Sequence, residues 1–140
     1  MDSRRGTFKP YKPFEAKFET VAAIGMIHGY KRKMLIVCSY LPPGMKSHLD
    51  CMEEIVGIMN QAKIDYSDPF ILIGGGFNEF SVAPILAVCS SLRLCESPPT
   101  RHDKTIDLLI TNFDSHIKES RALEPLSDIN GVESDHNVMF

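Results

Sequence analysis

Alternating apolar and polar positions define a pair of strands near the start of the chain. In residues 18–28, small and β-branched side chains alternate with their neighbours, which is typical of a β-strand. A polar turn at residues 29–33 leads into Met34–Tyr40, a continuous apolar run typical of a strand buried on both faces. We expect these strands to form a hairpin that ends where Pro42 begins a Pro-Pro-Gly sequence.

Two later segments have the three-and-four spacing of amphipathic helices. Residues 47–63 carry one apolar stripe, and the S-x-x-D sequence that begins at Ser47 matches a capping box. A second helix is predicted to begin at Ser81, with Pro84 in its first turn and an apolar stripe that reaches Leu92. Because each helix has a single apolar stripe, both should pack against the outside of a sheet.

Four further strands complete the predicted order. Phe70–Ile73 is a short apolar run, which three glycines are expected to end. Strands are also expected at residues 105–110, 117–123 and 137–140. The order strand-strand-helix-strand-helix-strand-strand-strand predicts the α/β class, with a mixed sheet or two sheets and helices outside them.

The chain is expected to have two regions, a lead-in over residues 1–17 and a domain over residues 18–140. Five Lys and Arg side chains lie between residues 4 and 17. Pro10 and Pro13 interrupt them and forbid a regular helix. We interpret the lead-in as basic and extended, and as a solvated tail rather than a nucleic-acid arm.

Composition changes this picture little and excludes several classes of protein. The 140 residues are 44% hydrophobic and 24% charged, which excludes wholesale disorder, and the apolar runs are too short for a membrane span. The net charge of -3 argues against a dedicated non-specific nucleic-acid binder. The chain starts without the apolar core of a secretory signal peptide.

We therefore expect an intracellular protein that does not associate with membranes, with the nucleus as one candidate compartment. The cysteines do not have the spacing of a metal site, and we expect small, buried, reduced thiols. They are Cys38, Cys51, Cys89 and Cys95.

Three features of the sequence carry chemical information. Gly74–Glu79 places Asn78 after a glycine run that could cradle phosphate, although a plain turn is the alternative. Asp107 lies inside an apolar strand, where it is either paired or faces solvent at a sheet edge. Asp135 and His136 are adjacent, so on a strand they point to opposite faces and each needs its own partner. A carboxylate partner at Asp107 would raise the pKa of the His136 imidazole and keep it cationic.

These motifs, in this order, resemble the endonuclease/exonuclease/phosphatase superfamily, and most of all the endonuclease domains of non-LTR retrotransposons. The family pattern is Tyr-x-Pro-Pro, Gly-Asp-Phe-Asn, a Thr-containing loop, Ile-Asp and Ser-Asp-His. The matching residues are 40–43, 75–78, 100–101, 106–107 and 134–136. The resemblance covers roughly residues 18–140. It implies an incomplete deoxyribonuclease I-like fold, which is a partial α/β sandwich of mixed sheets with outer helices.

The resemblance implies a catalytic role for five residues. His136 would contact the scissile phosphate and would be oriented by Asp107. Asn78 would orient the phosphate or the attacking water, and Tyr40 would donate to a phosphate oxygen. Asp135 would lie beside the divalent metal.

The resemblance also implies a metal and a substrate. The metal would be Mg²⁺ with Asp135 as its ligand, since Mg²⁺ commonly uses one or two carboxylates together with substrate oxygens. The substrate would be DNA or another nucleic acid. Thr100 and Arg101 would contact its backbone.

Two departures from the family pattern predict weak or absent activity. Gly76 stands where the family has an aspartate, and general acid–base groups contribute about 10²–10⁴-fold to rate. Nothing before Phe18 resembles the family's N-terminal half, which supplies an asparagine and a metal-binding glutamate. Without that half, one apolar sheet face would be exposed, and the chain could associate with itself through that face.

Three functions are therefore compared. The first is a degenerate Mg²⁺-dependent phosphodiesterase of the endonuclease type that acts on DNA. The second is a non-catalytic nucleic-acid or protein interaction module on the same scaffold, which Gly76 favours. The third is a lipid or inositol phosphatase of the same superfamily, and it ranks last because no phosphatase signature lies near Pro98.

Overall fold

The computed structural model describes residues 6–95, 99, 107–113, 122–123 and 138–139. The elements in these ranges are β1 (Thr7–Pro10), β2 (Thr20–Met26), β3 (Met34–Tyr40), α1 (His48–Tyr66), β4 (Phe70–Gly76), α2 (Ala83–Ala87), β5 (Arg93–Leu94), β6 (Asp107–Thr111), β7 (Ala122–Leu123) and β8 (Val138–Met139). Six strands form one sheet in the order β1-β2-β3-β4-β6-β5, and β7 pairs with β8. Neither described helix is long and apolar enough to cross a bilayer.

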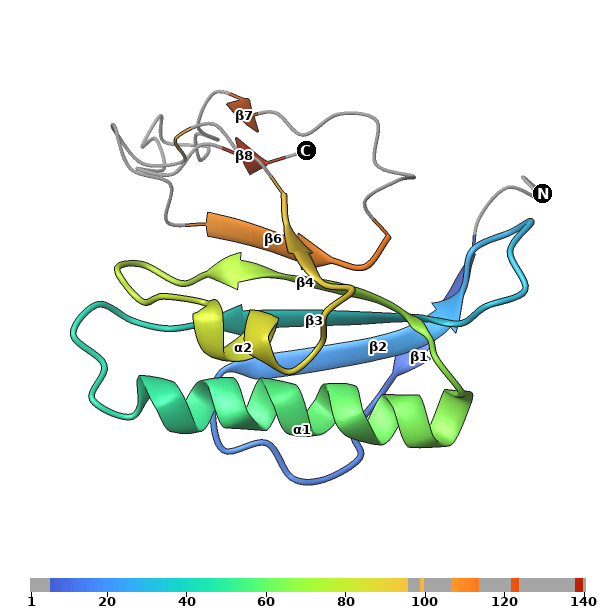
Figure 1. The fold of residues 1–140 in the computed structure, drawn as a ribbon, viewed down its shortest axis with the longest axis horizontal. Helices are drawn as coiled ribbons and strands as arrows, with labels where there is room; N and C mark the ends of the chain where they lie inside the picture. Colours follow the sequence, from blue (N-terminus) through green and yellow to red (C-terminus); the bar gives the residue numbers. More distant parts are fainter. Residues whose placement is uncertain (1–5, 96–98, 100–106, 114–121, 124–137, 140) are drawn as a thin grey trace, which may run out of the picture.

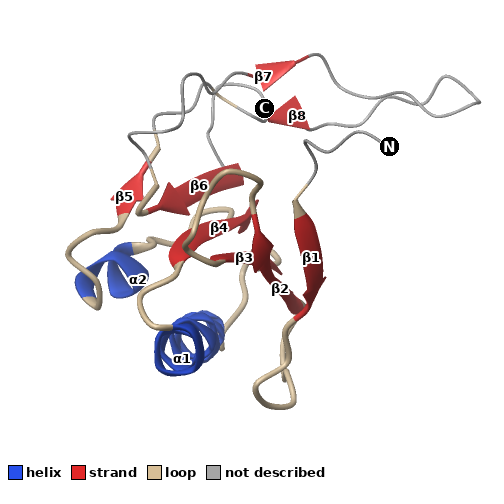
Figure 2. Ribbon diagram, turned by 90° about the vertical axis from the view of Figure 1, so that its right-hand side faces the viewer, coloured by secondary structure: helices blue, strands red, loops and turns tan. Residues whose placement is uncertain are grey.

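The main sheet is mixed, as the sequence predicts. β3 and β4 are parallel, and the other neighbouring pairs are antiparallel. The parallel pair needs a long crossover, which α1 provides. Both helices lie on the same side of the sheet (Figures 1 and 2).

The core lies between this side of the sheet and the helices. Alternate side chains of β3 and β4 point toward α1, and they are fully buried because successive strand residues point to opposite faces. Leu35, Val37, Ile71 and Ile73 form this layer, and each is 0% exposed. The fully buried helix residues Met52, Ile55 and Met59 belong to the same core cluster.

The opposite face of the sheet, called here the open face, carries the other set of side chains. Val21 is 69% exposed and Tyr40 is 43% exposed, and Cys38 is also exposed. Two predictions are therefore wrong, because Met34–Tyr40 is not buried on both faces and Cys38 is not a buried thiol. The physical reason is that both described helices cover the other side.

The lead-in is part of the sheet. Thr7–Pro10 forms β1, which pairs antiparallel with β2. Tyr11 follows and is buried, with its hydroxyl donating to Asp65 Oδ2 at 2.6 Å. The extended conformation is confirmed, but the interpretation as a tail is wrong for Thr7–Pro10, because these exposed residues pair along β2 as an edge strand.

The two helices differ from their predicted lengths. α1 ends at Tyr66 rather than at residue 63, and Ser47 makes no side-chain capping bond, so the predicted capping box does not form. α2 has five residues, and Leu92 lies beyond its end.

The glycine run does not end its strand, which is a further correction. β4 continues to Gly76, and Gly74–Gly76 pair with β3 on one side and β6 on the other. The two-residue strand β5 is an element that the sequence did not predict. The strands expected at residues 117–123 and 137–140 lie mostly outside the described residues, and β7 and β8 are their described parts.

Candidate functional site

Three of the positions singled out in the sequence lie on one row across the sheet. Tyr40 pairs with Gly76 in the parallel ladder, and Gly76 pairs with Asp107 in the antiparallel ladder. Cross-strand partners point to the same face, which here is the open face. The row lies along the edge of the sheet that is formed by strand ends: β3 and β4 both end there, and the antiparallel strand β6 begins there. Topology therefore joins three segments that are far apart in the sequence.

Gly76 lies between the other two members of this row. A Cβ atom built on Gly76 would lie 3.2 Å from Tyr40 Cδ2 and 3.4 Å from Asp107 Oδ1. The tyrosine ring and the carboxylate therefore flank the position at which the sequence has a glycine. A side chain at position 76 would require the Tyr40 ring to move by a few tenths of an ångström.

The preceding residue, Gly75, is under a different constraint. Its φ is +150°, and an added Cβ would collide with the Ser39 carbonyl oxygen of β3. Gly75 is thus required by the strand pairing, whereas Gly76 is not. The suggested phosphate cradle is wrong, and so is the plain turn, because these glycines belong to the sheet.

Asn78 lies just beyond the row and links two loops. Its φ is 49°, a left-handed conformation that asparagine tolerates. Its Nδ2 donates to the Leu41 carbonyl oxygen at 2.6 Å, and the Leu41 N–H donates to the Gly76 oxygen at 2.9 Å. Phe77 is 0% exposed and anchors the loop in the core. The Asn78 amide nitrogen therefore serves the fold, and the Oδ1 oxygen is the end of the side chain that this bond leaves for a ligand.

A second set of contacts holds the same two loops together. The Gly44 N–H donates to Glu79 Oε1 at 2.8 Å. The His48 ring stacks on Phe80, with 4.4 Å between centroids and 11° between planes. His48 is half-buried. Sequence reasoning missed this connection because no local pattern relates the two loops.

The other predicted site residues are not covered by the structure. Thr100, Arg101, Asp135 and His136 lie outside the described residues, so their roles stay predictions. Tyr40, Asn78 and Asp107 are described, and all three lie at the same edge of the sheet. Tyr40 is 43% exposed and Asp107 is half-buried, so solvent reaches this edge.

The donor set limits what metal this edge can hold. In the described part of the chain, no group of three His, Cys, Asp or Glu side chains could bind a metal ion. Asp107 supplies one carboxylate to the row, and the Glu79 carboxylate is bonded to the Gly44 N–H. One carboxylate is the lower limit for Mg²⁺, which completes its shell with water and substrate oxygens. The family resemblance assigns Asp107 to orienting His136, and the ligand predicted from the sequence, Asp135, lies outside the described residues, so the Mg²⁺ site stays a prediction.

Comparison with solved structures identifies this architecture. The chain superimposes on the endonuclease domain of TRAS1, a telomere-specific non-LTR retrotransposon, with a TM-score of 0.70 and 16% identity over 96% of this chain. It also matches an endonuclease/exonuclease/phosphatase family protein from Bacteroides thetaiotaomicron (TM-score 0.61, 13% identity, 86% of this chain). D. rerio TDP2 complexed with single strand DNA product gives a TM-score of 0.53 and 10% identity over 95% of this chain.

These matches cover 67%, 54% and 64% of the three solved chains, respectively. No family model matches the sequence, and no curated protein matches it. The identities are low, so the likeness concerns the fold. The chain has part of a deoxyribonuclease I-like fold, as the sequence motifs predicted.

Proposed function

We propose that the chain is a degenerate fragment of a Mg²⁺-dependent phosphodiesterase of the endonuclease type, acting on DNA. The observation that carries this proposal is the row of Tyr40, Gly76 and Asp107 at the carboxyl ends of the parallel strands. Ligands of α/β proteins gather at such ends. The scaffold supports a phosphodiesterase because the TRAS1 domain, an endonuclease, has this fold.

Each described residue has a proposed part in hydrolysis of a phosphodiester. The Tyr40 hydroxyl would donate to a non-bridging phosphate oxygen, and Asn78 would orient the phosphate or the water with its amide oxygen. Asp107 would accept from the His136 imidazole and hold it toward the scissile phosphate. When bound, Mg²⁺ would neutralise phosphate charge beside Asp135.

The missing carboxylate at position 76 is the reason to expect weak turnover. The attacking water must lose a proton, and glycine offers no group that accepts it. The space between Tyr40 and Asp107 is the space that an aspartate would fill. The remaining residues would bind and orient the phosphate without activating water.

We infer a nucleic-acid partner on the same grounds. D. rerio TDP2 holds a single strand DNA product on this fold. Thr100 and Arg101 would contact the backbone of the bound strand in this chain. An intracellular compartment that contains DNA, such as the nucleus, fits this partner.

A plasmid-nicking assay tests the function of the chain as it stands. We expect little or no Mg²⁺-dependent nicking by the purified chain, and any residual nicking should fall further in the His136→Ala and Asp107→Asn variants. A contaminating nuclease would give nicking that none of these variants changes. Robust nicking that His136→Ala abolishes would contradict the proposed degeneracy, although it would support the assignment of the site.

One observation favours an interaction module as the second candidate. The open face exposes apolar side chains, among them Val21 at 69% and Phe8 at 40%. The relatives of this fold are longer, and this chain spans 54–67% of them. We propose that the open face mediates self-association. A monomer at all concentrations in analytical ultracentrifugation would contradict this, and a dimer that a Cys38→Asp substitution on the open face dissociates would support it.

A further inference from the structure

The connection between β1 and β2 is an arch that is anchored at both ends. We call residues Tyr11–Lys17 the strap. At its start the Tyr11 hydroxyl donates to Asp65 Oδ2 at 2.6 Å, and the Tyr11 N–H donates to the Ala22 oxygen at 2.9 Å. At its end the Lys17 N–H donates to Glu54 Oε2 at 2.7 Å. Two α1 carboxylates therefore fix the position of the strap.

The middle of the strap rests on the helix. Phe14 lies over Gly57, where an added Cβ would come within 3.3 Å of the Phe14 ring. The Tyr11 ring meets Tyr66 edge-on at 5.7 Å between centroids. The absence of a side chain at residue 57 thus gives the Phe14 ring its place. The strap is held by α1 at three points, and a hollow lies between it and β2.

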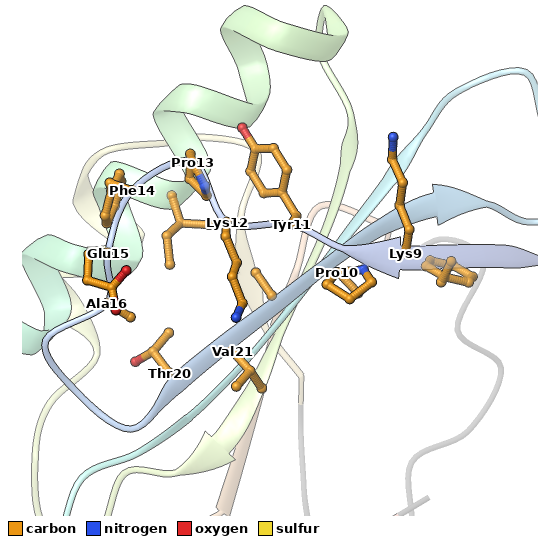
Figure 3. A pocket seen from close by; sticks show the side chains of 14 residues that line it. Lys9, Pro10, Tyr11, Lys12, Pro13, Phe14, Glu15, Ala16, Thr20 and Val21 are labelled. Carbon is orange, nitrogen blue, oxygen red and sulfur yellow. The ribbon is translucent and has the colours of Figure 1, made fainter.

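This hollow, called here the strap cavity, has the size of a ligand site. Its volume is about 500 Å³. Pockets that take small molecules typically measure about 300–1,000 Å³. Figure 3 shows side chains from the strap and β2 around it, and Ile58 of α1 also lines it. The walls are mainly apolar, and none of the predicted catalytic residues lines them.

Three charged side chains line the cavity, Lys9 of β1 and two residues of the strap. Lys12 extends across it toward Val21, while Glu15 lies nearer Thr20 (Figure 3). The Thr20 hydroxyl is already bonded to Ser39 at 2.8 Å. Among the described residues the one salt bridge joins Arg32 and Asp68, so Lys12 and Glu15 are not paired with each other. An anion could therefore bind the Lys12 ammonium without displacing a carboxylate.

We propose that the strap cavity binds a small organic anion with an apolar body. The apolar part would contact Phe14, Val21 and Ile58, and the anionic group would bind Lys12. An added peptide strand fits poorly, because Pro10 and Pro13 lack the N–H groups that strand addition needs.

Titration with anilinonaphthalene sulfonate, a monoanion with an apolar body, tests this proposal on the full chain. The chain has no Trp, so the dye can be excited without exciting an indole. We expect saturable binding, with shifts of strap and β2 amide signals in NMR spectra. Val21→Asp should weaken it by at least about tenfold, because it places a carboxylate on an apolar wall. Lys12→Met should weaken it by about 2- to 5-fold, as expected for one exposed ion pair.

Two matched variants serve as controls. Ile64→Asp changes an apolar side chain that is 74% exposed and does not line the cavity, and Lys31→Met removes an exposed charge elsewhere. Neither should change the affinity. Absence of saturable binding, an equal loss in the control variants, or amide shifts confined to β4 and β6 would overturn the proposal. A fall in affinity confined to the Val21 and Lys12 variants would support it.

Discussion

The two faces of the main sheet differ in what their side chains do. Toward the helices, Ile71 and Ile73 of β4 are fully buried, and Gly75 lies on the same side. Toward the open face, the same strand presents Leu72, Gly74 and Gly76. One face supplies the packing that holds the domain together, and the other carries the row proposed to bind phosphate. A single strand therefore serves stability and chemistry with alternate residues.

This division explains why neighbouring positions have different tolerance to change. Gly75 cannot take a side chain because the Ser39 carbonyl occupies the space, while Gly76 can take one between two flexible neighbours. A loss at the proposed catalytic position thus leaves the fold intact. Degeneration of the site and retention of the fold are physically compatible.

The largest effect is expected from truncating a side chain on the helix-facing side. Ile73→Ala should lower the free energy of unfolding by about 2–5 kcal/mol, because it leaves a cavity in a fully packed core. The open-face substitution Val21→Ala should change it by less than about 0.5 kcal/mol. Urea unfolding of both variants measures the difference. Equal effects would break the distinction between the faces.

A second prediction compares the two adjacent glycines. Gly75→Ala should cost at least about 1–3 kcal/mol, because alanine is strained at this φ and its Cβ collides with backbone. Gly76→Ala should cost less than about 1 kcal/mol, since the Tyr40 ring can move. Thermal unfolding of the two variants tests this. The reverse order would show that the register of β3 and β4 is wrong.

A smaller effect is expected at the strap, on the helix side. Burial, followed by the bond to Asp65, raises the pKa of Tyr11, and the Tyr11 hydroxyl lowers the pKa of Asp65. A carboxyl with a lowered folded-state pKa stabilises the fold above its unfolded value, about 3.9, and the stabilisation disappears as pH falls through the folded value. Tyr11→Phe should therefore lower the free energy of unfolding at pH 7. In this variant the free energy of unfolding should also fall less steeply as the pH decreases through the acid range, and a fall as steep as in the unchanged chain would contradict the bond.

Thiol reactivity sharpens the comparison without changing stability. Burial raises the pKa of Cys51 in the core. Burial also acts to raise the pKa of Cys89, but its bonds with Ser91 and the nearby Lys63 outweigh this and lower it. Iodoacetamide labelling followed by mass spectrometry should modify Cys38 on the open face and Cys89 in the folded chain, and Cys51 only on unfolding. In Lys63→Met, labelling of Cys89 should shift to higher pH. Fast labelling of Cys51 would show that the core is open.

The parts of the fold predicted from the sequence are those with local signals. The apolar runs of β3 and β4 and the apolar stripe of α1 are local signals in the sequence. Burial of one face makes every second residue of a strand apolar, and every third or fourth residue of a helix. β1 carries no such signal, since its pairing with β2 is non-local. The extension of β4 to Gly76 was missed because ladders on both sides override the weak strand preference of glycine.

The candidate site was predictable to a similar extent. Motif order placed Tyr40, Asn78 and Asp107 together, and strand direction gives the reason, since two strands end where the third begins. The bond from Asn78 to Leu41 could not be read from the sequence, because it depends on the geometry of two loops. The roles of Asp135 and His136 stay predictions.

Restoring the missing carboxylate is the most direct test of the proposed site. Plasmid nicking by Gly76→Asp should be Mg²⁺-dependent and exceed that of the unchanged chain by about 10²–10⁴-fold, the range of a general acid–base group. Adding Asp107→Asn or His136→Ala to this variant should remove the gain, and Gly76→Asn should not produce it. A folded Gly76→Asp variant that binds DNA but gives no gain in nicking would contradict the claim that the row is a phosphodiesterase site lacking one carboxylate.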